Sequence, residues 1–219
     1  MDKNNEKVSM EEHHLPQDVT HQTNSVDESR RRFTKSGLVV SGVLLTLASR
    51  PSLGGGLACK SPSGFSSANL SHHGSQQTCS GLTPGYWGNW GGSGPQPNKW
   101  PSPYQPGTCK KNTTGNKPSD WSGGTLFKNV FNCIGNGSIY SSYSLMQVIW
   151  LTGGGDPNQL GAHIVAALLN AKSGLTPVLT VPQVINIFNE WNQNGYFSPT
   201  VGVKWYSGDI VTYLESTMS

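Results

Sequence analysis

The sequence contains little charge, and it has no arginine beyond Cys59. Only 12% of the 219 residues are charged, and the segment from Cys59 onward holds eight lysines and five acids. Recognition of bases and phosphates relies strongly on the bidentate hydrogen bonds of arginine, so a nucleic-acid partner is not expected. Five acids also leave little choice for a catalytic pair of carboxylates.

The sequence also lacks an apolar run that matches a permanent membrane span. The run from Gly37 to Ala48 has about a dozen residues, whereas a spanning helix needs roughly 18 or more. Three arginines and a lysine precede it, and small or helix-breaking residues follow it up to Ala58. This order is typical of a cleaved secretory signal and predicts an exported protein.

No Cys-x-x-Cys motif is present, which argues against a redox pair or a zinc knuckle. All four cysteines follow the signal, and an even number in an exported chain predicts two disulfides. Three pairings are open. We favour bridges between sequence neighbours, which need the least organisation of the chain: Cys59 with Cys79, and Cys109 with Cys133.

Residues 29–35 read Ser-Arg-Arg-Arg-Phe-Thr-Lys and resemble the twin-arginine export motif of bacteria. Its defining positions are occupied by Arg30, Arg31, Phe33 and Lys35, and Thr34 departs from the apolar residue usual there. The resemblance implies that the twin-arginine machinery exports the folded protein to the periplasm or the extracellular space. A signal for the general secretion route, and lipidation at Cys59, are the alternatives.

Composition divides the chain into four segments. Residues 1–28 form a polar leader with almost nothing to bury, which predicts disorder. The signal follows at residues 29–58. Residues 59–124 are rich in Gly, Pro and aromatics without periodicity, and they predict an irregular, disulfide-tied segment. It is expected to pack as one domain with residues 125–219.

Residues 125–219 predict a mainly α fold, a small bundle of four to five helices. A short amphipathic turn covers residues 125–131, and a central helix, apolar nearly all round, covers residues 143–151. Asp156 is expected to cap a helix that has Pro157 at its first position and stops at Gly174. Two further helices follow, one capped by Thr180 with Gln183 and ended by Gly195, the other opened by Ser207.

Residues 82–87, Leu-Thr-Pro-Gly-Tyr-Trp, stand just after Cys79. Together with a later helical pattern that ends in Leu-Asn-Ala at residues 169–171, they are similar to uncharacterised bacterial exported domains with a Cys…Thr-Pro-Gly-Tyr-Trp motif. Those domains continue with Lys-Asn-His, where this chain has Gly88-Asn89-Trp90. The resemblance covers most of residues 59–171 and implies no particular activity.

Candidate site residues are few, and no catalytic residue or cofactor is predicted. His72 and His73 are weak metal candidates, because adjacent histidines in an extended segment point opposite ways. His163 is expected to be a partly buried, hydrogen-bonded helix residue. Exposed aromatics bind sugar faces or partner surfaces, and the same side chains also build a core. The aromatics for which both roles stay open are Tyr86, Trp87, Trp90 and Trp100.

These features predict an exported envelope or extracellular interaction or matrix protein without catalytic activity. Polysaccharide or envelope proteins are the expected partners. A secreted hydrolase acting on cell-wall or extracellular carbohydrate, and a periplasmic metal- or cofactor-binding protein, are the alternatives.

Overall fold

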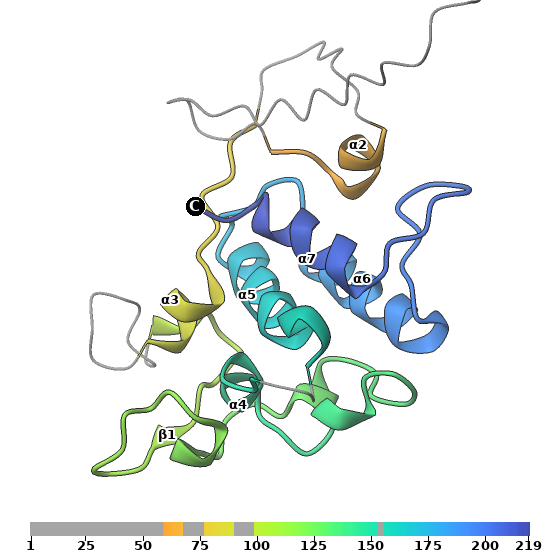
Figure 1. Ribbon diagram of the computed structural model, residues 1–219. Coiled ribbons are helices and arrows are strands. Elements are labelled where there is room, and N and C mark those ends of the chain that lie inside the picture. The colour runs from red at the N-terminus through yellow and green to blue at the C-terminus, as the bar shows by residue number, and fades with distance from the viewer. Residues whose placement is uncertain (1–58, 68–76, 90–98, 153–155) are drawn as a thin grey trace, which may run out of the picture. The chain divides into compact units, whose positions relative to one another are not determined.

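The computed structural model describes residues 59–67, 77–89, 99–152 and 156–219 (Figure 1). The described part is rich in helix, as expected. It contains six α-helices, more than the four to five predicted, because two short helices form within the segment predicted to be irregular. The elements are α2 (Pro62–Ser66), α3 (Pro84–Gly88), β1 (Thr108–Cys109), β2 (Trp121–Ser122), α4 (Leu145–Ile149), α5 (Leu160–Lys172), α6 (Val181–Asn194) and α7 (Ser207–Glu215).

Helix α5 is the element against which the other helices pack. Helices α3, α4, α6 and α7 all contact it (Figure 1). It is buried all round from Leu160 to Asn170, not along one stripe. Small residues allow the close approach, since a Cβ at Gly161 would lie 2.6 Å from a ring carbon of Tyr140. The helix expected at the centre, residues 143–151, is buried but shorter, and α5 takes the central place.

The start of α5 differs in detail from the prediction. Pro157–Gln159 form a 3-10 turn, with Asn158 and Gln159 at φ of 55° and 58°, so the α-helix begins only at Leu160. The Asp156 carboxylate nevertheless accepts hydrogen bonds from the N–H groups of Gly161 (3.0 Å) and Ala162 (3.4 Å). Asp156 therefore satisfies the first amides of α5 from across the turn.

Helix α6 begins and ends where the sequence predicts. The N–H of Thr180 donates to the Gln183 side chain at 2.8 Å, as expected of a capping box. At the other end Gly195 takes a φ of 78°, and its N–H donates to the Trp191 carbonyl at 2.7 Å. This left-handed position favours glycine and ends the helix.

The predicted amphipathic turn near residue 127 is a 3-10 turn that feeds an aromatic cluster. Phe127 and Phe131 stack with their ring centroids 4.5 Å apart. Tyr140 and Phe188 each lie 5.0 Å from Phe127. The cluster joins the loop region before α4 to α6.

The segment after Cys79 docks on α5 through one buried side chain, Asn170. The Asn170 Oδ1 accepts the Leu82 N–H (2.8 Å) and the Trp87 Nε1–H (2.9 Å), and its Nδ2 donates to the Leu82 carbonyl (2.9 Å). The Thr-Pro-Gly-Tyr-Trp motif therefore meets the Leu-Asn-Ala motif. Their contact is structural: it fixes α3, which the Thr83 side chain caps, onto the central helix.

The C-terminal residues pair with the same segment. The Gly81 N–H donates to the Thr217 carbonyl at 3.1 Å, and the Ser219 N–H donates to the Gly81 carbonyl at 2.8 Å. A Cβ at Gly81 would lie 2.5 Å from the Thr217 oxygen, so only glycine fits this approach.

Candidate functional site

A hairpin between α6 and α7 carries the most exposed apolar side chain of the described residues. Residues 196–206, here called the tyrosine hairpin, are held by two hydrogen bonds between Phe197 and Trp205, of 2.9 and 2.8 Å. At the tip the Val203 N–H donates to the Thr200 carbonyl at 3.2 Å, and Gly202 has a φ of 80°. This is the conformation of a type II turn, which requires a positive φ at its third residue.

The inner face of the tyrosine hairpin fixes it to the helices. Phe197 and Trp205 are buried. The Trp205 ring centroid lies 5.7 Å from that of Phe65 on α2 and 5.2 Å from that of Tyr213 on α7. The Ser198 N–H also donates to the Glu190 carboxylate of α6 at 2.9 Å. These contacts hold the outer face in one position.

The outer face of the tyrosine hairpin consists of Tyr196, Lys204 and Tyr206. The two tyrosine rings stand 6.4 Å apart at 66°, and the Lys204 ammonium lies 4.2 Å from the centre of the Tyr196 ring. Tyr206 is 59% exposed, and Val201 at the tip is fully exposed. Tyrosine offers a flat apolar ring with a polar end, and such residues are enriched in binding surfaces.

The aromatics singled out from the sequence include no residue of the tyrosine hairpin. A signal is present, because Tyr196-Phe197 and Trp205-Tyr206 flank a short stretch containing a glycine, as in a hairpin. Of the aromatics that were singled out, Trp87 and Trp100 are buried in the core, and Tyr86 is 38% exposed on α3. The Trp100 Nε1–H donates to the Trp87 carbonyl at 3.2 Å, and Trp90 lies outside the described residues. The structure therefore favours the core alternative for Trp87 and Trp100.

The cysteines agree with the prediction in one of two pairs. Cys59 and Cys79 form a disulfide. Cys109 and Cys133 are free thiols, which corrects the second predicted pair. The two cysteines lie in different parts of the fold. Cys109 belongs to β1 and lies beside the Thr113 hydroxyl, whereas Cys133 comes directly after a residue whose N–H donates to the Asn189 side chain of α6. Burial raises the pKa of the Cys133 thiol, and nearby Lys128 lowers it in part.

Asp156 and Tyr140 form the most buried polar pair at the start of α5. The Tyr140 hydroxyl donates to Asp156 Oδ1 at 2.6 Å. Burial raises the pKa of Asp156 above its ordinary value, although the hydrogen bonds from Tyr140, Gly161 and Ala162 oppose this rise. Burial and the neighbouring carboxylate raise the pKa of Tyr140 beyond its usual range. The pair is a structural tie between α5 and the loop region before α4.

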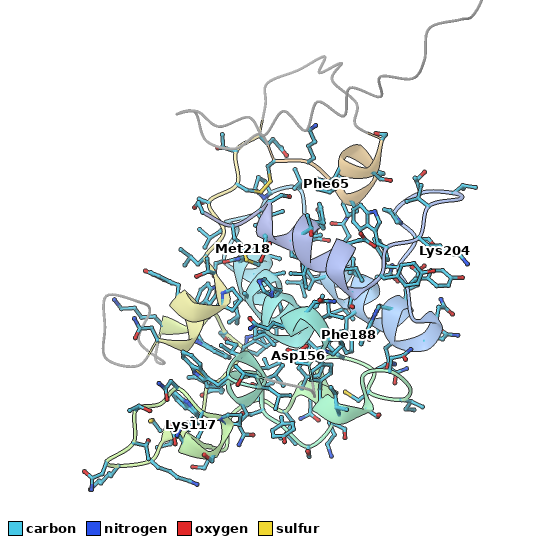
Figure 2. The ribbon with its side chains drawn as sticks, viewed as in Figure 1. Phe65, Lys117, Asp156, Phe188, Lys204 and Met218 are labelled. Atoms are coloured by element: carbon cyan, nitrogen blue, oxygen red, sulfur yellow. A yellow bond between two sulfur atoms is a disulfide. The ribbon has the colours of Figure 1, made fainter. Side chains whose placement is uncertain are left out.

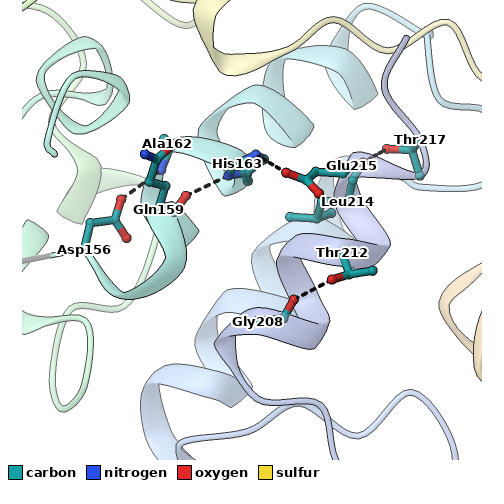
Figure 3. Close-up of polar contacts among 9 residues, drawn as sticks. All are labelled: Asp156, Gln159, Ala162, His163, Gly208, Thr212, Leu214, Glu215 and Thr217. Atoms are coloured by element: carbon teal, nitrogen blue, oxygen red, sulfur yellow. Dashed lines mark hydrogen bonds and ion pairs between the residues drawn. The ribbon is translucent and has the colours of Figure 1, made fainter. Parts of the chain in front are cut away.

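His163 lies one turn further along α5 and faces two acceptors. Its Nδ1 lies 2.9 Å from the Gln159 carbonyl, as the sequence predicts for a hydrogen-bonded helix histidine, and its Nε2 lies 3.3 Å from the Glu215 carboxylate of α7 (Figure 3). His163 is nearly buried and Glu215 is exposed. The pair connects the two helices at the surface.

The remaining three acids of the described residues also have local partners. Asp120 is buried and lies 3.5 Å from the Thr114 hydroxyl. Glu190 accepts the Ser198 N–H, and Asp209 accepts the Tyr206 N–H at 2.9 Å, as expected for an acid in the first turn of α7. Each of the five carboxylates thus holds a nearby part of the chain.

The other predicted site residues lie outside the described part of the chain. They are the export-signal residues Arg30, Arg31, Phe33 and Lys35 and the histidines His72 and His73. Among the residues that are described, no three His, Cys, Asp or Glu side chains gather in an arrangement that could hold a metal ion. In the same residues, no helix is both long and apolar enough to cross a membrane.

Comparison with known proteins adds no assignment. No family model, curated protein or solved structure matches this chain. What the protein can do therefore has to follow from the chemistry of its own residues.

Proposed function

We propose that the protein is an exported interaction or matrix component of the cell envelope or extracellular space. In this proposal it binds its partner through the outer face of the tyrosine hairpin and catalyses no reaction. The observation that carries the proposal is the exposure of Tyr206 and Val201 on a hairpin whose inner face is anchored to α2 and α7. A rigid aromatic surface loses little conformational entropy on binding.

The hydrogen bonds of Asp156, Glu190 and Asp209 support a non-catalytic role. A glycosidase needs two carboxyl groups that flank one substrate bond. Here Asp156 is occupied by Tyr140 and two backbone amides, and Glu190 and Asp209 each accept a backbone N–H. These bonds favour the interaction proposal over the alternative of a secreted hydrolase.

Export by the twin-arginine route is part of the proposal. It is supported by the Ser-Arg-Arg-Arg-Phe-Thr-Lys stretch at residues 29–35 and by the disulfide between Cys59 and Cys79. Disulfides persist in oxidising compartments such as the periplasm and the extracellular space.

The binding proposal is tested by retention on insoluble polysaccharide. The double variant Tyr196→Ala and Tyr206→Ala is compared with the wild type on peptidoglycan sacculi and on cellulose. We expect at least one material to retain the wild type, and the double variant to be retained at least about fivefold less, since aromatic contacts carry much of such binding energy.

Tyr86→Ala is the matched control, because it removes an exposed tyrosine from α3 and leaves the hairpin intact. It should be retained like the wild type. Equal retention of wild type and double variant would show that the tyrosine hairpin is not the binding surface. Loss of retention in the Tyr86→Ala variant alone would show that the binding surface lies on α3. Thermal unfolding of each variant checks that the fold is intact.

A further inference from the structure

Positive charge is concentrated in one stretch of the sequence after Cys59. Five of the eight lysines after Cys59 lie between residues 99 and 128, and the same stretch contains a single acid, Asp120. Asp120 is 7% exposed, so its carboxylate is turned into the protein. Three of these lysines belong to one loop between β1 and β2, here called the lysine loop (residues 110–117): Lys110, Lys111 and Lys117, all exposed.

The lysine loop is held in place from within. Strands β1 and β2 pair at its base, and the Lys110 N–H donates to the Asp120 carbonyl at 2.8 Å. The buried Trp121 donates its Nε1–H to the Gly115 carbonyl at 2.8 Å, and the Thr113 hydroxyl donates to the Lys110 carbonyl at 2.9 Å. The loop backbone is thus fixed by the protein, and the lysine side chains extend outward.

Helix α4 adds a further anchor to the base of the lysine loop. The Gln147 Nε2 donates to the carbonyls of Pro118 (3.2 Å) and Trp121 (3.1 Å). Because Gln147 lies on a helix that packs on α5, the loop is connected directly to the core. Such support fixes the backbone positions from which the three lysine side chains extend.

The positive charges of the lysine loop form no ion pair within the described part of the chain. Among those residues, the only lysine or histidine nitrogen within 4.0 Å of a carboxylate oxygen is His163 Nε2, which lies 3.3 Å from Glu215, far from this loop in sequence. The ammonium groups of Lys110, Lys111 and Lys117 therefore remain available to an external anion. Like charges on one loop repel each other, and a polyanion would relieve that repulsion.

We propose that the lysine loop binds an acidic polysaccharide whose repeating sugars carry carboxylates. The ammonium group of lysine pairs with single anionic groups as a compact point charge, whereas arginine, which this part of the chain lacks, binds planar carboxylate and phosphate groups through two parallel hydrogen bonds. The amide and hydroxyl side chains of Asn112, Thr113 and Asn116 are exposed between the lysines and suit the hydroxyl groups of sugars.

The aromatic content of the lysine loop also favours a polysaccharide over a single-stranded nucleic acid. Binding of single strands relies on exposed aromatic rings on which bases stack. The aromatic nearest the loop in sequence, Trp121, is 2% exposed, and residues 110–117 contain no aromatic. Charge and hydrogen-bonding groups are therefore what the loop offers.

The lysine loop is separate from the tyrosine hairpin. Lys117 and Lys204, one from each surface, lie at opposite sides of the molecule in Figure 2. The loop is anchored on α4, whereas the hairpin is anchored on α2 and α7. The two surfaces can therefore be tested independently, and failure of one leaves the other standing.

The test measures the affinity of the full chain for soluble polygalacturonate. We expect the triple variant Lys110→Gln, Lys111→Gln and Lys117→Gln to bind at least about tenfold more weakly, since each lysine near an anionic surface contributes to attraction. The affinity of the wild type should also fall steeply with salt, because these charges are exposed. Neutral dextran serves as the uncharged polymer and should not bind.

The matched control is the double variant Lys60→Gln and Lys172→Gln, which removes two charges outside residues 99–128. It is compared with the lysine-loop double variant Lys110→Gln and Lys111→Gln, and it should bind within about twofold of the wild type. The arginines of residues 30–32 are present in every protein compared, so they cancel in the comparison. Equal weakening of the two double variants would overturn the proposal, as would absence of wild-type binding. Tighter binding to duplex DNA, lost in the lysine-loop variant, would overturn the choice of partner.

Discussion

Asp156 shows how strongly the surroundings of one residue affect its chemistry. The residue is 4% exposed, and its carboxylate accepts hydrogen bonds from Tyr140, Gly161 and Ala162. Hydrogen bonds to a carboxylate lower its pKa, whereas burial raises it. At Asp156 burial is the larger effect, and the pKa lies above its ordinary value of 3.8. The folded protein therefore binds a proton at this site more tightly than the unfolded chain does.

The raised pKa of Asp156 predicts how stability depends on pH. Between 3.8 and the raised pKa, the folded state holds more protons than the unfolded state, so the free energy of unfolding falls as pH rises. Asp156→Asn removes this titration. We expect the stability of the wild type relative to the variant to decline across this window, by at most about 1.4 kcal/mol for each pH unit that the window spans.

Urea unfolding between about pH 3.5 and pH 7 measures the Asp156 effect. Gln193→Leu, which exchanges an exposed side chain of α6 that does not titrate, is the control and should leave the slope of the wild type in place. An NMR titration that places the Asp156 carboxyl pKa at or below 3.8 would contradict the prediction.

At the scale of elements, the docking of α3 on α5 depends on Asn170. This side chain is fully buried and satisfies three groups, the Leu82 N–H, the Leu82 carbonyl and the Trp87 Nε1–H. Leucine is similar in size to asparagine, but the variant Asn170→Leu leaves all three of these groups without a hydrogen-bond partner. Since each unsatisfied buried group costs about 1–3 kcal/mol, we expect a loss of about 3 kcal/mol in the free energy of unfolding.

Chemical unfolding followed by tryptophan fluorescence measures the Asn170 effect, because Trp87 reports on the docked segment. Gln193→Leu makes a comparable exchange on the exposed face of α6 and should change stability by less than about 0.5 kcal/mol. A loss for Asn170→Leu no larger than that of Gln193→Leu would show that the docking does not depend on this side chain.

The helices were largely predictable, whereas the surfaces that we propose as binding sites were not. Helix α6 has local signals at both ends, in Thr180 with Gln183 and in Gly195, and these suffice to fix its limits. The tyrosine hairpin has a single antiparallel bridge, between Phe197 and Trp205, and its position depends on contacts of Trp205 with distant Phe65 and Tyr213. Such long-range contacts leave no periodic pattern in the sequence.

At the scale of the whole molecule, the sequence predicts one of the two cysteine pairs correctly and the other wrongly. The bridge between Cys59 and Cys79 follows from closeness in sequence, and the Cys59 N–H also donates to the Gln77 carbonyl at 2.8 Å. The same reasoning is wrong for Cys109 and Cys133. Spacing along the chain does not show that β1 holds one of them and the turn before α4 the other.

One measurement, the intact mass of the protein recovered outside the cytoplasm, tests both the cysteine states and the export proposal. We expect a chain that begins near Cys59 and is two hydrogens lighter than its reduced form. Alkylation in denaturant should label two thiols, because Cys109 and Cys133 are both free. A mass four hydrogens below the reduced form would show that a second disulfide forms and would contradict the free thiols.

Replacing Arg30 and Arg31 with lysine should keep the protein in the cytoplasm with its signal attached, and continued export in a strain without the twin-arginine machinery would reject that route.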